Sequence, residues 1–239
     1  MSYGRIGVIG AMDSELAALI AALAQPARET VQGLAFHTGR LGAREVVLVR
    51  CGIGKVSAAR CTQVLIDRFA PAAVINTGIA GGLGAGLAVG DIVVADGLVQ
   101  HDFDAAPIGF VRGCLCMGDP GAPTVFTPDE PLSALLARTA GDAAGAQRVH
   151  RGLIATGDQF ISGAAAKAAI RSAFPSAMAA EMEGGAVAQA ASMSGVPFAV
   201  VRAISDLADG TAAASFEQFE QHAADVSAAA VLQALALLD

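Results

Sequence analysis

The feature that most constrains this chain is the regular alternation of short apolar runs with longer segments of helical periodicity. Several of the apolar runs are continuous in Val, Ile and Ala, as in strands that are covered on both faces. The strand-like runs are 5–11, 34–39, 45–50, 73–77, 91–98, 148–156, 177–181 and 197–204, and the helix-like runs are 13–23, 55–69, 131–142, 164–174, 185–193 and 216–238. This order predicts an α/β fold with a mixed, mostly parallel central sheet flanked by helices.

The chain shows no internal repeat and no low-complexity linker, so we expect a single domain over 1–239. Runs 34–39 and 45–50 predict a hairpin through Leu41, Gly42 and Ala43. Segment 102–128 is rich in Gly and Pro and lacks periodicity. A loop of that length predicts a lid, a binding loop or an interface segment.

Composition excludes several classes of function. A net charge of −7 and a pI near 5.0 argue against a nucleic-acid partner, because binding phosphates needs a basic surface. No window of about 18 residues is free of polar breaks, so we expect no membrane span and a cytoplasmic location. The four cysteines form no CxxC pair and no zinc spacing, which predicts buried free thiols. We expect no metal and no cofactor, which leaves small-molecule chemistry.

Carboxylates follow several of the strand-like runs, although only 15% of the residues are charged. These acids are Asp13, Glu15, Asp158, Glu181, Glu183 and Asp206. Ligands of α/β enzymes bind beyond the carboxyl ends of the strands, so this placement predicts a site there. A structural role is the alternative for each acid. Glu15 could be a first-turn acid, Asp158 a turn cap and Glu181 half of an ion pair.

Two glycine-rich stretches follow strand-like runs. Residues 52–55 read Gly-Ile-Gly-Lys and lack the third glycine or the Ser/Thr that a nucleotide-binding loop requires, so they predict a tight turn. Residues 76–83 predict a turn whose glycines let the backbone approach a ligand closely.

Seven stretches together carry a resemblance to a known family. They are Ile9-Gly10-Ala11-Met12-Asp13-Ser14-Glu15, Gly52-Ile53-Gly54-Lys55-Val56, Asn76-Thr77-Gly78-Ile79-Ala80-Gly81-Gly82, Gly90-Asp91-Ile92-Val93, Gly157-Asp158-Gln159-Phe160-Ile161, Glu181-Met182-Glu183 and Val201-Arg202-Ala203-Ile204-Ser205-Asp206. In this order and spacing the chain resembles the bacterial 5′-methylthioadenosine/S-adenosylhomocysteine nucleosidases, a branch of the nucleoside phosphorylase superfamily. The resemblance covers about residues 5–238.

The resemblance implies hydrolysis of the N-glycosidic bond of adenine nucleosides that carry a 5′-thioether. Asp206 matches the general acid that protonates adenine at N7, and Glu15 matches the base that deprotonates the attacking water. Glu183 matches the carboxylate that holds the ribose hydroxyls. An acid and a base on opposite faces of the anomeric carbon follow the logic of inverting glycoside hydrolysis.

The resemblance also implies a substrate-binding set and a partner. The binding residues it implies are Met12, Ile53, Ile79, Phe160, Ile161, Met182, Arg202, Ser205 and Phe216. Arg202 would orient Glu15 and the water. The partner would be a second copy of the chain, because family members lend the segment equivalent to 105–110 across a homodimer interface. That segment lies here within 102–128.

Other functions stay open at this stage. Ile79 stands where the family often carries Ser, which makes a phosphate site less expected and favours hydrolysis over phosphorolysis. The alternatives are a phosphate-dependent purine nucleoside or methylthioadenosine phosphorylase, an aminodeoxyfutalosine nucleosidase, and a nucleoside-binding protein without turnover. 5′-Deoxyadenosine is a further substrate that the resemblance allows.

Overall fold

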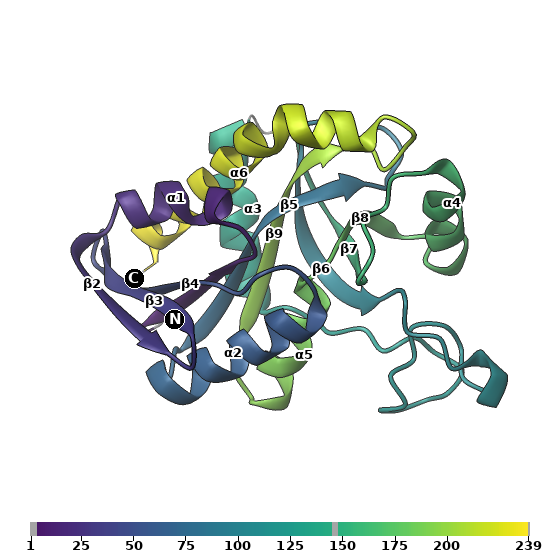
Figure 1. The fold of residues 1–239 in the computed structure, drawn as a ribbon, viewed down its shortest axis with the longest axis horizontal. Helices are drawn as coiled ribbons and strands as arrows, with labels where there is room; N and C mark the ends of the chain where they lie inside the picture. The colour runs from purple at the N-terminus through teal and green to yellow at the C-terminus, as the bar shows by residue number, and fades with distance from the viewer. Residues whose placement is uncertain (1–3, 145–147, 239) are drawn as a thin grey trace.

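The computed structural model describes residues 4–144 and 148–238, and Figure 1 shows their arrangement. Within these residues, nine strands form one sheet in the order β2-β3-β4-β1-β5-β8-β7-β6-β9. The strands are β1 Ile6–Gly10, β2 Ala24–Val31, β3 Leu34–Leu41, β4 Arg44–Arg50, β5 Ala73–Gly82, β6 Ile92–Gln100, β7 Val149–Thr156, β8 Ala177–Glu181 and β9 Phe198–Asp206. The helices are α1 Asp13–Ala21, α2 Lys55–Phe69, the 3₁₀ turn η1 Ala106–Ile108, α3 Glu130–Ala144, α4 Ala164–Ala173, α5 Gly184–Met193 and α6 Ala212–Leu237.

The sheet is mixed, as the sequence predicted. Strand β1 pairs in parallel with β4 and β5, and the pairs β5–β9, β6–β7 and β7–β8 are also parallel. The predicted hairpin is confirmed, because β3 and β4 pair in antiparallel register. Strand β9 pairs with both β5 and β6, so β5, β8, β7, β6 and β9 form a closed ring of paired strands. This ring brings the ends of β5, β8 and β9 close together.

Helices cover both faces of the sheet. Figure 1 shows α1, α3 and α6 on one face, α2 and α5 on the other, and α4 beside β7 and β8. A large buried cluster lies under each layer: one joins α1, α3 and α6 to the sheet, and the other joins α2 and α5 to it. The burial of strands such as β1 and β9 along their whole length explains their continuous apolar sequences.

Strand β2 was missed by the sequence analysis. Its sequence, AQPARETV, is largely exposed and polar, and it contains Pro26. It forms an edge of the sheet and pairs only with β3 among the described residues. An edge strand often lacks the hydrophobic alternation that identifies a strand in a sequence. Pairing with β3 is therefore what holds this segment in a β conformation.

Strands β5 and β9 run further than predicted. Residues 76–83 were expected to turn, but β5 continues through Gly82 because it pairs with β9 as far as Asp206. The register shifts between Ala80 and Gly81, at the end of that ladder. The extension places Ile79 and Asp206 on neighbouring strands instead of in loops.

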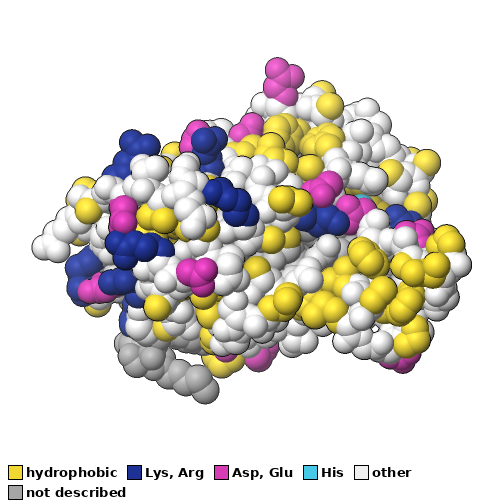
Figure 2. Space-filling view, turned by 60° about the horizontal axis from the view of Figure 1, so that its bottom comes forward, with side chains coloured by type: hydrophobic (Ala, Val, Ile, Leu, Met, Phe, Trp, Pro, Cys, Tyr) yellow, Lys and Arg dark blue, Asp and Glu magenta, His cyan; other side chains and the backbone are white. Residues whose placement is uncertain are grey.

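Segment 102–128 is irregular, as predicted, apart from η1 and a single bridge between Leu98 and Phe126. It projects from the body of the molecule at the lower right of Figure 1. Figure 2 shows apolar side chains gathered on this side, and Ile108, Met117 and Val125 are about half exposed or more. A projecting segment with exposed apolar side chains is suited to contact another surface.

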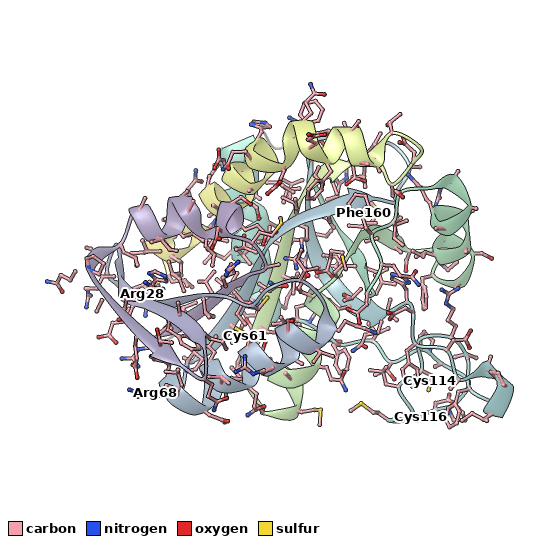
Figure 3. All side chains as sticks on the ribbon, viewed as in Figure 1. Arg28, Cys61, Arg68, Cys114, Cys116 and Phe160 are labelled. Carbon is pink, nitrogen blue, oxygen red and sulfur yellow. The ribbon has the colours of Figure 1, made fainter. Side chains whose placement is uncertain are left out.

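The cysteines are free thiols, and three of the four are buried as predicted. Cys116 is the exception, because it lies exposed in the projecting segment with a left-handed backbone (Figure 3). In the described part of the chain, no helix is both long and apolar enough to cross a bilayer.

Candidate active site

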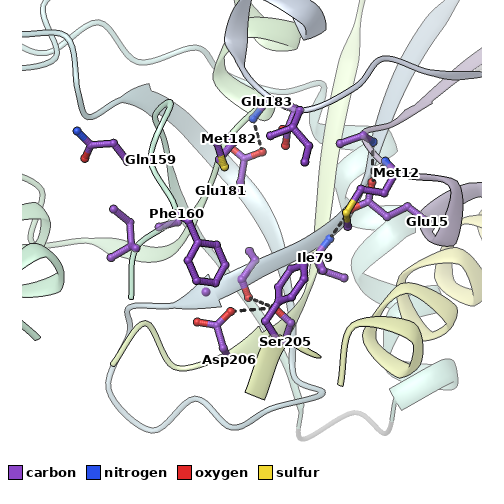
Figure 4. A pocket seen from close by; sticks show the side chains of 17 residues that line it. Met12, Glu15, Ile79, Gln159, Phe160, Glu181, Met182, Glu183, Ser205 and Asp206 are labelled. Atoms are coloured by element: carbon purple, nitrogen blue, oxygen red, sulfur yellow. Dashed lines mark hydrogen bonds between the residues drawn. The ribbon is translucent and has the colours of Figure 1, made fainter. Parts of the chain in front are cut away.

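A pocket with about 620 Å³ of space, including open solvent at its mouth, lies at the carboxyl ends of β5, β8 and β9. Its lining residues come from these strands, from the start of α1 and the segment before it, from the turns before α2 and α5, from residues 159–161 and from α6. They are Ala11, Met12, Glu15, Ile53, Ile79, Ala80, Gly81, Gln159, Phe160, Ile161, Ala180, Glu181, Met182, Glu183, Ser205, Asp206 and Phe216. The three predicted catalytic acids therefore share one pocket, and Figure 4 shows Glu15 and Asp206 on different sides of it.

Glu15 sits at the first turn of α1 with its carboxylate turned inward. Its Oε2 accepts the Ala11 and Met12 amides at 2.6 and 3.0 Å, and its Oε1 accepts the Ile79 amide at 3.1 Å. Burial raises the pKa of this carboxyl, while Arg202 and the three amides act in the opposite direction. A Cβ at Gly78 would lie 2.3 Å from Glu15 Oε1, so only glycine leaves room for the carboxylate there.

Glu183 precedes α5 and is buried in the pocket wall. Its Oε1 accepts the Gly54 amide at 2.9 Å. Gly54 begins α2 from a left-handed backbone, so the predicted tight turn supplies one of the hydrogen bonds of the site. Burial and the neighbouring Glu181 raise the pKa of Glu183 to about 8.

A buried ion pair with an N···O distance of 2.6 Å joins Glu181, which lines the pocket, to Arg202 behind it. Glu181 Oε2 also accepts the amides of Glu183 and Gly184, and Thr156 donates to Oε1. The structural role considered for Glu181 agrees with these contacts, which fix the start of α5 and hence Glu183.

Arg202 was predicted to bind substrate, but its side chain is 2% exposed and is not part of the pocket lining. Its guanidinium donates to Glu181, to the Asn76 side chain and to the carbonyls of Asn76 and Val201. No hydrogen bond joins it to Glu15 among the described contacts; its charge acts on Glu15 at a distance and lowers the pKa of that carboxyl. The ion pair with Glu181 draws it away from the cavity.

Asp206 ends β9 and is buried. Its Oδ1 accepts the Ala208 amide at 2.8 Å, and the Ser205 hydroxyl donates to its Oδ2 at 2.9 Å. Burial raises the pKa of Asp206, against these two hydrogen bonds. A Cβ on Gly81 would lie 3.0 Å from Oδ1, so the glycine of β5 leaves space for the carboxyl. A buried carboxyl with a raised pKa can hold a proton for donation.

The apolar walls come from residues that the sequence analysis had assigned to substrate binding. Phe160 and Phe216 meet edge to face with ring centroids 5.5 Å apart, and Figure 4 shows Phe160 near Asp206. Phe160 is half exposed, which leaves a ring face available for a planar ligand. Met12 and Met182 line the pocket nearby. The binding candidates not yet placed, Ile53, Ile79 and Ile161, also contribute to the lining.

Some lining residues were not singled out from the sequence. Ala11, Ala80, Gly81, Ala180 and Gln159 carry no reactive group, and their small or neutral side chains gave no signal on their own. Behind the wall, Asn76 donates to the Ile9 carbonyl and accepts from Arg202, which joins β1, β5 and β9. Asp158 accepts the Lys55 amide of the first turn of α2 at 2.8 Å, a contact between distant segments and not the cap of its own turn that the sequence analysis considered.

Comparison with known proteins agrees with this geometry. The sequence profile described as "Phosphorylase superfamily" matches residues 5–236, and the chain belongs to that superfamily. Within it, the chain is 42% identical to the 5′-methylthioadenosine/S-adenosylhomocysteine nucleosidase of Actinobacillus succinogenes, over 98% of this chain and 100% of the relative. The relatives thus place it in the nucleosidase branch.

Solved structures show the same relationship. The nucleosidase of the same name from S. pneumoniae, in complex with a transition-state inhibitor, superposes with a TM-score of 0.91 at 41% identity, covering 98% of this chain and 100% of the other. A futalosine hydrolase from Helicobacter pylori superposes with a TM-score of 0.87 at 32% identity, covering 97% of this chain and 97% of the other. The α/β fold is therefore that of the nucleosidases.

Proposed function

We propose that this chain hydrolyses the N-glycosidic bond of 5′-methylthioadenosine and S-adenosylhomocysteine and releases adenine. The observation that carries the proposal is one pocket holding Glu15 and Asp206 on different sides, with aromatic and thioether side chains between them. Curated and structural relatives that cover nearly the whole chain are named for these two nucleosides.

The chemistry divides between the two sides of the pocket. Breaking the bond leaves negative charge on adenine and positive charge on the ribose. Asp206, buried and with a raised pKa, protonates the leaving base. Glu15, whose carboxyl oxygens accept hydrogen bonds from three backbone amides, takes the proton of the attacking water. Glu183 accepts hydrogen bonds from the ribose hydroxyls and stabilises the developing cation.

The pocket favours water over phosphate as the nucleophile. None of the lining residues that the structure describes is Lys or Arg. Arg202, which lies behind the wall, is already paired with Glu181. Ile79 puts an apolar side chain where a hydroxyl could have held a phosphate oxygen. An oxyanion would enter beside the acidic side chains of the pocket without a lining cation to balance its charge, which is electrostatically unfavourable.

The test is adenine release from methylthioadenosine with the purified protein, with and without inorganic phosphate. We expect equal rates in both buffers and free methylthioribose as the second product. Release that depends strictly on phosphate and yields the sugar 1-phosphate would overturn hydrolysis.

A second substrate class is favoured by the futalosine hydrolase neighbour. The part of the pocket that holds the 5′ substituent decides between the thioether nucleosides and aminodeoxyfutalosine. 5′-Deoxyadenosine, which lacks a 5′ substituent, tests how much that substituent contributes to kcat/KM. Competition among methylthioadenosine, S-adenosylhomocysteine, 5′-deoxyadenosine and aminodeoxyfutalosine, measured as kcat/KM for each, ranks the substrates. The highest value for aminodeoxyfutalosine would move the assignment to that branch.

We also propose that the protein works as a homodimer in the cytoplasm. The support is segment 102–128, which projects from the body with exposed apolar side chains at Ile108, Met117 and Val125. Light scattering after gel filtration should give twice the 23.8 kDa chain mass. A monomer at micromolar concentration would contradict the dimer.

A further inference from the structure

Lys167 of α4 lies beside the proposed acid, although the resemblance assigned it no role. Its ammonium donates to the Gly82 carbonyl at 2.8 Å and to the Leu207 carbonyl at 2.7 Å. Gly82 ends β5, and Leu207 directly follows Asp206 at the end of β9. Lys167 therefore joins three segments at the edge of the pocket.

The position of this contact matters because the β5–β9 ladder becomes irregular there. The register shifts after Ala80, so that Gly81 stands opposite Asp206. The β5–β9 ladder ends at this pair, so the carbonyls of Gly82 and Leu207 need a donor other than the facing strand. The ammonium of Lys167 supplies it to both, and so holds the chain on which Asp206 and Ala208 lie.

Lys167 also acts on Asp206 through its charge. The charged groups with the largest effect on Asp206 are Asp209 from the following loop and Lys167 from α4. Asp209 raises the pKa of Asp206 and Lys167 lowers it, while burial is the largest effect and raises it. The pKa of Lys167 is itself lowered, and burial is the largest cause. Asp209 and Asp206 act to raise this pKa, and Arg171 acts to lower it.

We propose that Lys167 is a positioning residue for Asp206, fixing the backbone that carries the acid and placing a positive charge behind its carboxyl. The inference rests on the proposed function, since it assumes that Asp206 is the acid. A purely structural lysine would hold the two strands without influencing the protonation of Asp206.

The test is the pH profile of kcat/KM for methylthioadenosine in Lys167→Met and Lys167→Arg. Activity falls on the alkaline side as Asp206 loses its proton. Loss of the positive charge should move that limb upward by roughly half a pH unit or more. Lost positioning should reduce kcat about tenfold at the optimum. Lys167→Arg keeps the charge and the donors, so its limb should stay near the wild-type position.

Arg171→Met is the matched control, because Arg171 lies one turn further along α4 and is exposed. It removes a positive charge from the same helix but leaves the contacts of Lys167 in place. If Lys167→Met does not fold, Lys167→Gln replaces it. An unchanged alkaline limb in both uncharged variants, or an equal shift in Arg171→Met, would overturn the inference. Failure of the wild-type protein to release adenine would overturn the proposed function itself.

Discussion

Glu183→Gln measures the free energy that the protein loses by burying a carboxylate at position 183 without a cation to pair with it. Three carboxyls, those of Glu15, Glu181 and Glu183, are buried around one cation, Arg202. The cation is paired with Glu181, so Glu183 is left without a charge partner, and its pKa rises from 4.5 to about 8. A folded protein that binds a proton more tightly than the unfolded chain loses stability as the pH rises.

The magnitude follows from that shift. At 1.36 kcal/mol per pKa unit, a rise from 4.5 to about 8 corresponds to about 5 kcal/mol as an upper value. Glu15, whose buried carboxyl also has a raised pKa, shares part of the proton uptake, so we expect a cost of about 2 to 5 kcal/mol. The cost is absent below pH 4.5, grows between pH 4.5 and 8, and is complete above pH 8. Gln keeps an oxygen for the Gly54 amide and carries no charge, so it avoids the cost.

The assay is urea unfolding of the wild type and Glu183→Gln between pH 4.5 and 9. Their free energies of unfolding should agree near pH 4.5, and the variant should be more stable by about 2 to 5 kcal/mol at pH 9. Glu217→Gln, on the exposed side of α6, is the control for loss of a carboxylate and should not diverge in this way. A difference between Glu183→Gln and wild type that stays constant with pH would refute the reasoning.

Three further predictions concern the remaining parts of the site. Asp206→Asn should reduce adenine release by at least about 10²-fold while the protein stays folded, because an amide cannot donate the acid's proton; circular dichroism and single-turnover kinetics check this. Glu15→Gln should abolish turnover, and Gly78→Ala should do nearly the same by pressing a methyl group against Glu15 Oε1; adenine assays of both variants check this. Arg202→Met should destabilise the fold by about 3 to 5 kcal/mol, because it leaves Glu181 buried without its cation; urea unfolding measures this.

Each of these has an outcome that would count against it. Full activity of Asp206→Asn would remove the acid assignment, and turnover by Glu15→Gln would move the base elsewhere. An active Gly78→Ala protein would mean that the Glu15 carboxylate can shift without loss. For Arg202→Met, the double variant with Glu181→Gln serves as the control. If the double variant were no more stable than the single one, the buried charge would not be the cause of the loss.

Much of this protein is determined by the local pattern of its sequence. The alternation of apolar and amphipathic runs fixed the α/β class and six helices, because the burial of a strand or helix face is visible in its periodicity. Gly54, Glu15, Glu183 and Asp206 could be singled out because a glycine turn or an acid at a strand end has few local explanations. The resemblance to nucleosidases used the same residues.

Tertiary structure decided the rest. Strand β2 exists because it pairs with β3, and β5 and β9 extend to Gly82 and Asp206 because each supports the other. The difference between Glu181 and Glu183, two residues apart, is also tertiary: one meets Arg202 from β9 and the other does not. Which carboxyl is charged depends on distances between segments far apart in the chain, and no sequence pattern encodes those distances.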